Sequence, residues 1–283
     1  MQLFVSTSGV RSNAINQALA LVREGFTKIE LSGGSHIPNL EERLSELSSL
    51  AEAVMLHNYF PPPKEPFVFN LASENQEVIV RSMALAKIAI DKSAICGAKY
   101  YAVHAGFLFD PAVSDLGNAI GKSKLRPRDE GLEEFRRNIL VLAKYANEKK
   151  VKLLVENNVI SAANFLSFGC NPFLLASGQE IVDFFTNIGS EVGFLLDVGH
   201  LSVSSNVLSE PREYFLKGFS DFINGYHLHE NGRDSDQHLK IGENSWFMPL
   251  LNKEVDFATL EIHSQNFTEI KNSLEILRNV GLA

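Results

Sequence analysis

Residues 225–242 read GYHLHENGRDSDQHLKIG. Apolar and aromatic residues open this stretch in the manner of a buried strand, and the remainder is a polar loop punctuated by glycines. Histidines and acids crowd the stretch, at His227, His229, Glu230, Asp234, Asp236 and His238. Imidazole and carboxylate are the ligands that first-row divalent metals select. We therefore interpret the stretch as a strand whose end and following loop carry metal ligands.

The rest of the chain repeats a short apolar run followed by a helical pattern about every 30 to 40 residues, as an array of alternating strands and helices does. Strands are expected at residues 3–6, 27–31, 53–57, 100–103, 151–155, 192–196 and 257–260, with a seventh strand in chain order that ends on His227. Helices are expected at residues 13–24, 40–50, 74–96, 132–149, 179–188, 211–219 and 268–277, with a weak one at 246–251. This alternation predicts an α/β fold, a (β/α)8 TIM barrel. Because no linker or shift in composition appears, residues 1–283 are expected to form a single domain.

Composition narrows the classes of function. The chain is 45% hydrophobic, enough to bury a core, and it lacks the apolar run of about 18 residues that a membrane span requires. The first residues resemble a strand and not a signal peptide. Cys96 and Cys170 follow no metal or redox spacing, so we expect two buried free thiols in a cytoplasmic protein. The net charge of −8 disfavours binding to nucleic acid.

The expected strand ends carry the chemistry. In a barrel these ends converge on one rim, and they hold Glu30, His57, His104, Glu156, Asp197 with His200, His227 and Glu261. The loop after the seventh strand adds Asp236 and His238, two residues apart, so that both can turn the same way in an extended segment. One strand-end histidine alone is usually a hydrogen-bonded core residue. A carboxylate at the end of an apolar strand, as at Glu156 or Glu261, is costly unless it is paired or binds a cation. The rim is therefore predicted to bind metal, and Glu30 either supports the site, contacts substrate or makes an internal hydrogen bond.

Several motifs resemble a known family over essentially the whole chain. They are IELSGG (29–34), VHAG (103–106), VENN (155–158), LDVGH (196–200), the segment from YHLHEN to IGEN, and LEIH (260–263). The chain resembles the xylose-isomerase-like barrels, which include endonuclease IV and many sugar isomerases and epimerases. The resemblance implies that a divalent ion is held by Glu156, Asp197, His227 and Glu261. It also implies that His57, His104, His200, Asp236 and His238 match the further positions of the trinuclear zinc site of endonuclease IV.

On this basis the cofactor is expected to be manganese, cobalt, magnesium or zinc, with one to three ions per chain. The HLHEN pattern departs from the family, and it leaves open what His229 and Glu230 do. His229 could replace or supplement His227 as a ligand.

The first hypothesis from the resemblance is a metal-dependent isomerase or epimerase of a sugar, a sugar phosphate or a sugar-like acid. A bound ion would stabilise the enediolate, and Glu156 and Glu261 would exchange the proton on opposite faces of the substrate. Substrate contacts are expected from His200, Arg233, His229, Glu30 and Trp246. Arg233 lies six residues after His227, as in the ketose epimerases that the chain resembles. Aromatic residues in the loops offer a stacking wall for a sugar or pack the loops together, at Tyr59, Phe60, Phe107, Phe109, Trp246 and Phe247.

The second hypothesis is a multi-zinc phosphoesterase of the endonuclease IV kind, which the full set of nine ligand positions favours. Against it, the basic residues Lys122, Lys124, Arg126 and Arg128 are too few to grip duplex DNA. They would instead form a solvated loop or bind a phosphate or carboxylate of a small substrate. A third hypothesis is an iron-dependent or non-catalytic metal-binding barrel. The sequence leaves homo-oligomer formation open.

Overall fold

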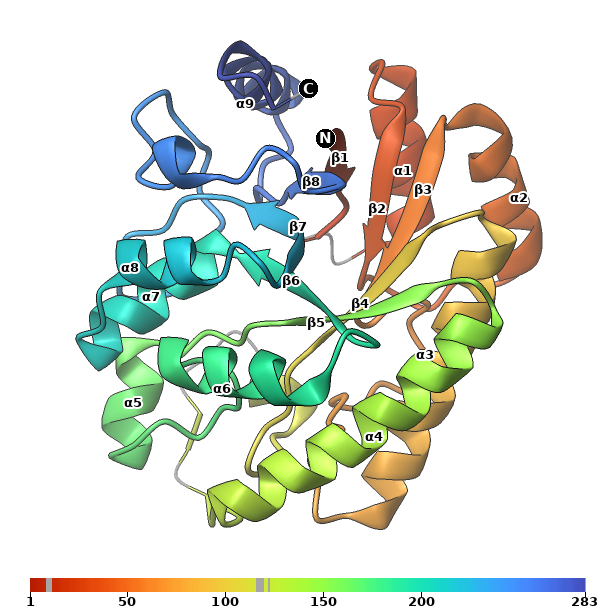
Figure 1. Ribbon diagram of the computed structural model, residues 1–283. Coiled ribbons are helices and arrows are strands. Elements are labelled where there is room, and N and C mark those ends of the chain that lie inside the picture. Colours follow the sequence, from red (N-terminus) through yellow and green to blue (C-terminus); the bar gives the residue numbers. More distant parts are fainter. Residues whose placement is uncertain (9–11, 116–119, 122, 283) are drawn as a thin grey trace.

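Eight parallel strands close into a barrel in chain order, with β8 paired to β1 (Figure 1). The computed structural model describes residues 1–8, 12–115, 120–121 and 123–282. The strands are β1 Gln2–Ser6, β2 Lys28–Ser32, β3 Ala53–His57, β4 Tyr100–His104, β5 Lys152–Glu156, β6 Gly193–Asp197, β7 Ile223–Leu228 and β8 Phe257–Leu260. The predicted single (β/α)8 TIM barrel is therefore confirmed as the fold.

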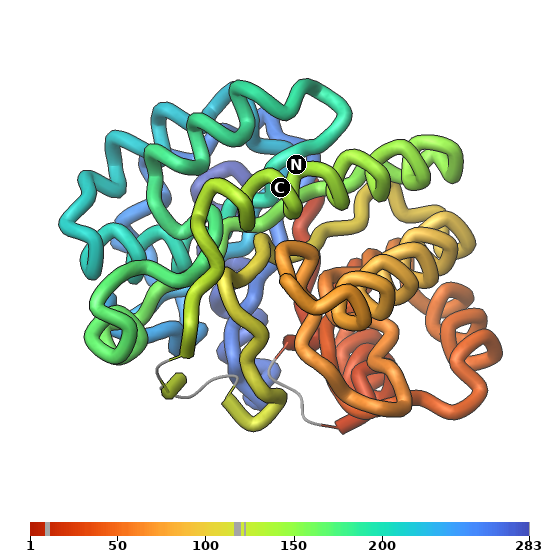
Figure 2. The backbone as a smooth tube through the Cα atoms, turned by 90° about the horizontal axis from the view of Figure 1, so that it is seen from below, coloured from red at the N-terminus to blue at the C-terminus, as the bar shows by residue number. Residues whose placement is uncertain are grey.

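Helices surround the barrel, and Figure 2 shows the long helices α3 and α4 lying against each other on its outside. The helices are α1 Ala14–Arg23, α2 Leu40–Leu50, α3 Gln76–Ile95, α4 Arg128–Glu148, α5 Ala162–Phe168, α6 Gly178–Ile188, α7 Val198–Leu208, α8 Arg212–Gly218 and α9 Phe267–Asn279, with short 3-10 turns η1 Val113–Asp115 and η2 Met248–Leu250. The amphipathic patterns of the sequence give most of these helices their buried faces.

Four helical segments differ from the sequence-based expectation. Helix α4 begins at Arg128 and not at residue 132, and the weak helix expected at 246–251 is only the turn η2. Helices α5 and α7 were not predicted. Helix α7 is buried nearly all round, so its sequence VGHLSVSSNVL shows no polar face to reveal it.

The interior of the barrel is built in layers. Apolar side chains fill its lower part, and they include Phe4, Met55, Ala102, Leu154, Leu195 and Phe257. Gly225 gives the Phe257 ring its room, because a Cβ there would lie 2.3 Å from Phe257 Cζ. Side chains on a strand alternate between its two faces, so residues two positions apart share a face. The next inward layer therefore begins at the residues two positions after these apolar ones.

Two remaining expectations concern the cysteines and the membrane. Cys96 is only partly buried and Cys170 is exposed, so the prediction of two buried thiols was wrong. Cys170 follows Gly169, whose left-handed conformation ends α5 and turns the chain outward. Within the described ranges, no helix is long and apolar enough to cross a membrane.

Candidate metal centre

The layer above the apolar core consists largely of acids and histidines. Two residues after Met55, Ala102, Leu154 and Leu195 come His57, His104, Glu156 and Asp197, whereas Phe4 and Phe257 are followed at this spacing by Ser6 and Thr259. Four groups of side chains bring ligand atoms within 4.8 Å of one another: Glu156, Asp197, His227 and Glu261; His57, His104 and Glu156; Glu30, His57 and His227; and His200, His229, Asp236 and His238. Shared members join the first three groups into one continuous centre.

The group from β3, β4 and β5 has the spacing of metal ligands. His57 Nε2 lies 3.1 Å from Glu156 Oε2 and 3.3 Å from His104 Nε2, and His104 Nε2 lies 3.3 Å from the same oxygen. Ligand atoms at the corners of a tetrahedral zinc site lie about 3.4 Å apart, given bonds of about 2.0–2.1 Å. The three donor atoms thus already form one face of such a tetrahedron.

The central group comes from β5, β6 and β7 and from Glu261, the residue directly after β8, and it is almost completely enclosed. His227 Nδ1 lies 2.7 Å from Glu261 Oε2, 3.5 Å from Glu156 Oε1 and 3.9 Å from Asp197 Oδ2. Glu156, Asp197 and His227 have no exposed surface, and Glu261 is 5% exposed. Three carboxylates therefore converge on one imidazole nitrogen in a place that water hardly reaches.

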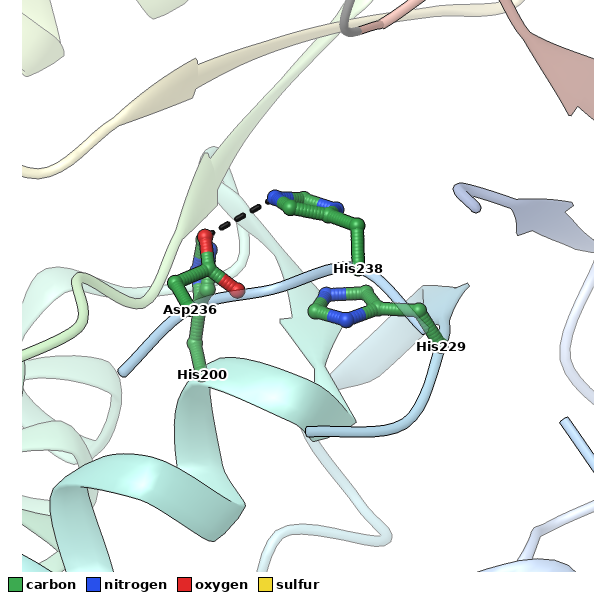
Figure 3. A group of neighbouring side chains, drawn as sticks. All are labelled: His200, His229, Asp236 and His238. Atoms are coloured by element: carbon green, nitrogen blue, oxygen red, sulfur yellow. Dashed lines mark hydrogen bonds and ion pairs between the residues drawn. The ribbon is translucent and has the colours of Figure 1, made fainter. Parts of the chain in front are cut away.

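The fourth group lies beside the central one and joins α7, the end of β7 and the loop that follows (Figure 3). His238 Nε2 lies 2.8 Å from Asp236 Oδ2, and His200 Nε2 lies 3.3 Å from the same oxygen. His229 reaches toward the central group, with Nε2 3.0 Å from Asp197 Oδ2.

Charge balance makes this centre unusual, because five carboxylates lie in it: Glu30, Glu156, Asp197, Asp236 and Glu261. Burial alone would raise the pKa of Glu156, but the charges of His104, His227 and His57 hold it well below its usual range. The pKa of Glu261 is likewise lowered, against the effect of burial, by His227 and His238. Glu156 and Glu261 are therefore charged at neutral pH and need cations beside them.

In the metal-free protein, protons on histidines supply part of that positive charge. Burial opposes a charged His238, yet its hydrogen bond to Asp236 and the charge of Glu261 raise its pKa to about 9. The pKa values of His200 and His227 are also raised by the acids around them, against burial. The pKa of His104 is instead lowered to about 4, mainly by burial. Since metals bind neutral imidazole, an ion entering the centre would displace these protons.

Besides their charge balance, the residues fit a divalent ion because several of their buried polar atoms lack hydrogen-bond partners. Within the part of the chain that the structure describes, neither carboxylate oxygen of Glu156 has a partner with hydrogen-bond geometry, and His227 Nδ1 and His57 Nδ1 also lack one. Glu156 meets its neighbours at ion-pair distance only. Buried polar atoms without hydrogen bonds are rare in proteins, and a bound ion is one recognised explanation for them. The donor set of carboxylates and imidazoles suits manganese, cobalt or zinc.

Asn157 is a positioning residue that the sequence analysis missed. Its side chain brackets Asp197, accepting a hydrogen bond from the Asp197 N–H at 2.8 Å and donating to the Asp197 carbonyl at 3.1 Å. Its own carbonyl lies 2.9 Å from His200 Nδ1. Asp197 in turn caps α7 by accepting from the His200 N–H. The signal was present in VENN, where a polar residue directly follows the β5 carboxylate.

Glu30 supports His227, one of the expected metal ligands, by contacting the ring nitrogen that faces away from the central group. Its carboxylate oxygens lie 3.1 and 3.2 Å from His227 Nε2, and Thr259 Oγ1 donates to Glu30 at 3.0 Å. An Nε2–H donated to Glu30 leaves the lone pair of His227 on Nδ1, which faces Glu156 and Glu261. Of the roles considered from sequence, the geometry therefore favours support of the site, because Glu30 is 2% exposed.

Replacing Glu30 is expected to weaken metal binding without removing a donor atom from the central group. We expect Glu30→Gln, which keeps an acceptor for His227, to reduce metal affinity by about 10-fold, and Glu30→Ala by up to about 100-fold. Competition with a chromophoric chelator measures both. Thr259→Val, which deletes only the hydroxyl that donates to Glu30, is the matched control and should have the smallest effect. Unchanged affinity in Glu30→Ala would contradict this role.

The structure places two expected substrate contacts away from the centre. The Arg233 side chain is exposed, its carbonyl accepts from Asn206 of α7, and its charge acts on Glu213 of α8. The indole of Trp246 lies under the Arg212 guanidinium, 4.2 Å from ring centroid to Cζ. Phe107 and Phe109 pack on Phe173 at centroid distances of 5.5 and 6.2 Å, which favours the loop-packing explanation for this pair.

Two arginines of the basic cluster, Arg126 and Arg128, make their contacts within the protein. Arg126 donates to the carbonyls of Ala72 and Ser73, and Arg128 forms a two-pronged ion pair with Glu180 at 2.8 and 2.7 Å. Lys124 is exposed, and Lys122 lies outside the described residues. Arg126 and Arg128 therefore hold loops together. They are neither part of a solvated loop nor a binding site for a phosphate or carboxylate of a substrate, which were the two alternatives for this cluster.

His263 is a neighbour of the centre that went unnoticed in the sequence. Its ring stacks on His238 with centroids 3.9 Å apart, and His238 stacks on His229 at 4.1 Å. The three rings form a column along the edge of the centre. His263 belongs to none of the four ligand groups.

Comparison with known proteins identifies relatives of the same architecture. The model of a family described as xylose isomerase-like TIM barrel matches residues 19–280. No curated protein sequence matches the chain. A solved D-tagatose 3-epimerase-like protein is 19% identical, with a TM-score of 0.72, covering 99% of this chain and 97% of its own. The TTHB071 protein from Thermus thermophilus, soaked with ZnCl2, is 16% identical with a TM-score of 0.66 over 99% of both chains. D-psicose 3-epimerase from Clostridium cellulolyticum is 12% identical with a TM-score of 0.68 over 99% of both chains. At these identities the likeness shows the fold.

Proposed function

The chain belongs to the xylose isomerase-like TIM barrel family, and we propose that it is a metal-dependent isomerase or epimerase of a sugar, a sugar phosphate or a sugar-like acid. One observation carries the proposal: the ligand atoms of Glu156, Asp197, His227 and Glu261 lie within 4.8 Å of one another at the buried end of the barrel. Two of these carboxylates, Glu156 and Glu261, would also move the substrate proton. The sugar epimerases among the structural neighbours are consistent with this chemistry.

A bound divalent ion would supply Lewis-acid polarisation of adjacent carbonyl and hydroxyl oxygens, which acidifies the neighbouring C–H. The chain's own part is to hold Glu156 and Glu261 charged, so that each can accept a proton. Both have pKa values that the surrounding histidines keep low. Their strands, β5 and β8, are separated by β6 and β7 around the ring, so the carboxylates approach the centre from different sides. This arrangement suits removal of a proton by one carboxylate and return by the other.

Access to the centre comes from one side. The side chains of His104 and Asp236 are 29% and 23% exposed, while those of Glu156 and Asp197 are fully buried. A substrate would therefore enter past His104 and the loop that bears Asp236.

Glu261→Gln tests the proton transfer. The amide keeps an oxygen that can bind the ion but cannot accept a proton, so we expect turnover of a confirmed sugar substrate to fall by about 10²- to 10⁴-fold. Incorporation of solvent deuterium at the reacting carbon should fall with it. Metal content measured on the same sample controls for loss of the ion. Full turnover by Glu261→Gln would rule out proton exchange between two glutamates.

A second candidate, a multi-metal phosphoesterase, is favoured by Glu156, which belongs to both the central group and the group with His57 and His104. Adjacent ions that share a carboxylate suit in-line phosphoryl transfer. The candidates separate in one experiment that combines metal content with two assays. Sugar conversion with one manganese, cobalt or magnesium per chain supports the isomerase. About three zinc ions per chain with salt-sensitive cleavage of DNA at abasic sites supports the phosphoesterase.

A further inference from the structure

We propose that His229 is a positioning residue that orients two metal ligands at once, Asp197 in the central group and His238 in the fourth group. The proposal rests on the metal centre of the proposed function, and it gives a role to a residue whose role the HLHEN pattern leaves open. His229 directly follows β7 and has no exposed surface. Its ring contacts Asp197 with an edge and His238 with a face, and Figure 3 shows the second contact.

The orientation of its ring excludes His229 as a further ligand of the fourth group. The His229 and His238 rings are stacked, with centroids 4.1 Å apart and planes at 21°. The lone pairs of an imidazole lie in the plane of the ring, so two stacked rings cannot aim them at one ion. His229 Nε2 also lies 3.0 Å from Asp197 Oδ2, and because an ionised carboxylate only accepts hydrogen bonds, this nitrogen carries a proton. The ligand atoms of the fourth group are therefore those of His200, Asp236 and His238.

The edge of the ring fixes Asp197. His229 Nε2 donates to Asp197 Oδ2 at 3.0 Å, and the backbone N–H of His200 donates to Asp197 Oδ1 at 2.7 Å. One donor on each oxygen sets the rotation of the carboxylate. Asp197 has no exposed surface, so water cannot replace either donor. Partners that hydrogen-bond a ligating carboxylate tune the metal site, and their loss typically lowers metal affinity by about 10- to 100-fold.

The face of the ring fixes His238. The His238 ring lies between two others in the column, His229 at 4.1 Å and His263 at 3.9 Å, with the second pair of planes at 15°. The backbone of His238 has a φ of 48°, in the left-handed region that is unfavourable for a residue with a side chain. Such conformations persist where the surrounding contacts hold them. The two stacked rings therefore hold His238 in the orientation that brings its Nε2 to 2.8 Å from Asp236 Oδ2.

Gly199 allows the first turn of α7 to pack against the His229 ring. A Cβ at position 199 would lie 2.1 Å from His229 Cε1, 2.5 Å from Nδ1 and 2.6 Å from Nε2. The ring is thus confined between α7 and His238. Because one ring makes both contacts, moving it disturbs Asp197 and His238 together, although His229 itself binds neither ion.

Two substitutions of His229 separate the two contacts. His229→Phe keeps a ring that can stack on His238 and removes the N–H, whereas His229→Gln keeps an N–H that can reach Asp197 and removes the ring. We expect His229→Phe to weaken binding of the central ion by about 10- to 100-fold and to leave the ion of the fourth group near wild type. We expect His229→Gln to do the reverse, with a loss of about 2- to 10-fold at the fourth group, the size of one aromatic stacking contact.

Stepwise zinc titration of the metal-free protein by calorimetry measures both affinities. His227→Ala and His238→Ala each remove a ligand from one group, and they identify which binding step belongs to which group. Circular dichroism checks that each variant is folded. The crossed pattern is the decisive result, because general loss of stability would weaken both ions in both variants of His229.

Two further variants complete the test. Gly199→Ala should weaken both ions, because it displaces the His229 ring and leaves every side chain of the centre unchanged. His263→Ala is the matched control: it removes the other ring stacked on His238 without contact to Asp197, and it should weaken only the ion of the fourth group.

Three results would overturn the role of His229 while leaving the proposed function intact. They are wild-type affinities in either folded His229 variant, equal weakening of both ions in both variants, and complete loss of the fourth-group ion from folded His229→Phe, which would make His229 a ligand. A wild-type protein that binds no zinc, manganese or cobalt would instead refute the proposed function, and the role of His229 with it.

Discussion

Glu156→Gln is expected to lower turnover by about 10⁴-fold, the upper end of what a positioned acid–base group contributes, and to weaken metal binding at two groups at once. Glu156 is the side chain that the His57–His104 group and the Asp197–His227–Glu261 group share. Its oxygens lie 3.1 Å from His57 Nε2 and 3.5 Å from His227 Nδ1. Glutamine has nearly the same shape, so the barrel should still fold. The substitution therefore removes charge and basicity without leaving a cavity.

A matched variant separates this effect from general loss of a buried ion pair. Glu180 is a mostly buried glutamate that pairs with Arg128 on the outside of the barrel. Glu180→Gln should lower thermal stability while leaving metal content and turnover near wild type. Metal titration by calorimetry on both variants provides the measurement. If Glu156→Gln binds the same number of ions with the same affinity, Glu156 does not join the two groups.

Much of the centre could be predicted from sequence because the strands impose it. In chain order each strand from β3 to β8 brings a histidine or an acid to the same rim, and parallel pairing fixes the height of each. The register pairs His104 with Glu156 and Asp197 with His227. Alternation of side chains along each strand then turns these residues inward together. Residues far apart in the sequence thus become neighbours through backbone geometry that a pattern of apolar runs already reveals.

Residues in the long loops could not be placed in this way. Arg233 follows His227 at the spacing expected of a substrate contact, yet its loop is tied to α7 through Asn206 and its side chain is exposed. Trp246 lies under Arg212, a partner in another helix that no local pattern indicates. The direction of Glu30 also depends on a partner, His227, 197 positions away. Tertiary contacts decide these orientations, and spacing alone carries no information on them.

From the charge of the centre we expect that bound ions would stabilise the fold. Glu156, Asp197, Asp236 and Glu261 all have lowered pKa values, so they stay charged down to acidic pH and repel one another unless cations lie between them. Histidine protons provide part of that positive charge in the metal-free protein. Under the proposed function, metal ions would provide it in the loaded protein, by binding atoms that lack hydrogen-bond partners in the described part of the chain. The two forms should therefore differ in stability, and the difference should depend on pH.

Removal of metal with a chelator is expected to lower the melting temperature by about 10 °C at neutral pH. An ion present at about 1,000 times its dissociation constant stabilises the native state by about 4 kcal/mol, and each kcal/mol shifts the melting temperature of a domain somewhat smaller than this one by about 2–4 °C. Differential scanning calorimetry before and after chelation, and again after zinc or manganese is restored, measures the shift. A control with Glu180→Gln should show the same metal-dependent shift from a lower starting temperature.

The size of that shift should grow between about pH 6.5 and pH 9. Asp236 and Glu261 raise the pKa of His238 to about 9, against the effect of burial, and the pKa values of His200 and His227 are raised as well. A raised folded-state pKa contributes stability that is complete below the unfolded value of about 6.5 and is lost as pH rises through the folded value. The metal-free protein should therefore weaken over this range. The loaded protein should not, because its ligands are already deprotonated. A melting temperature that ignores the chelator, or a shift that shrinks as pH rises, would show that protons and not metal ions neutralise these carboxylates.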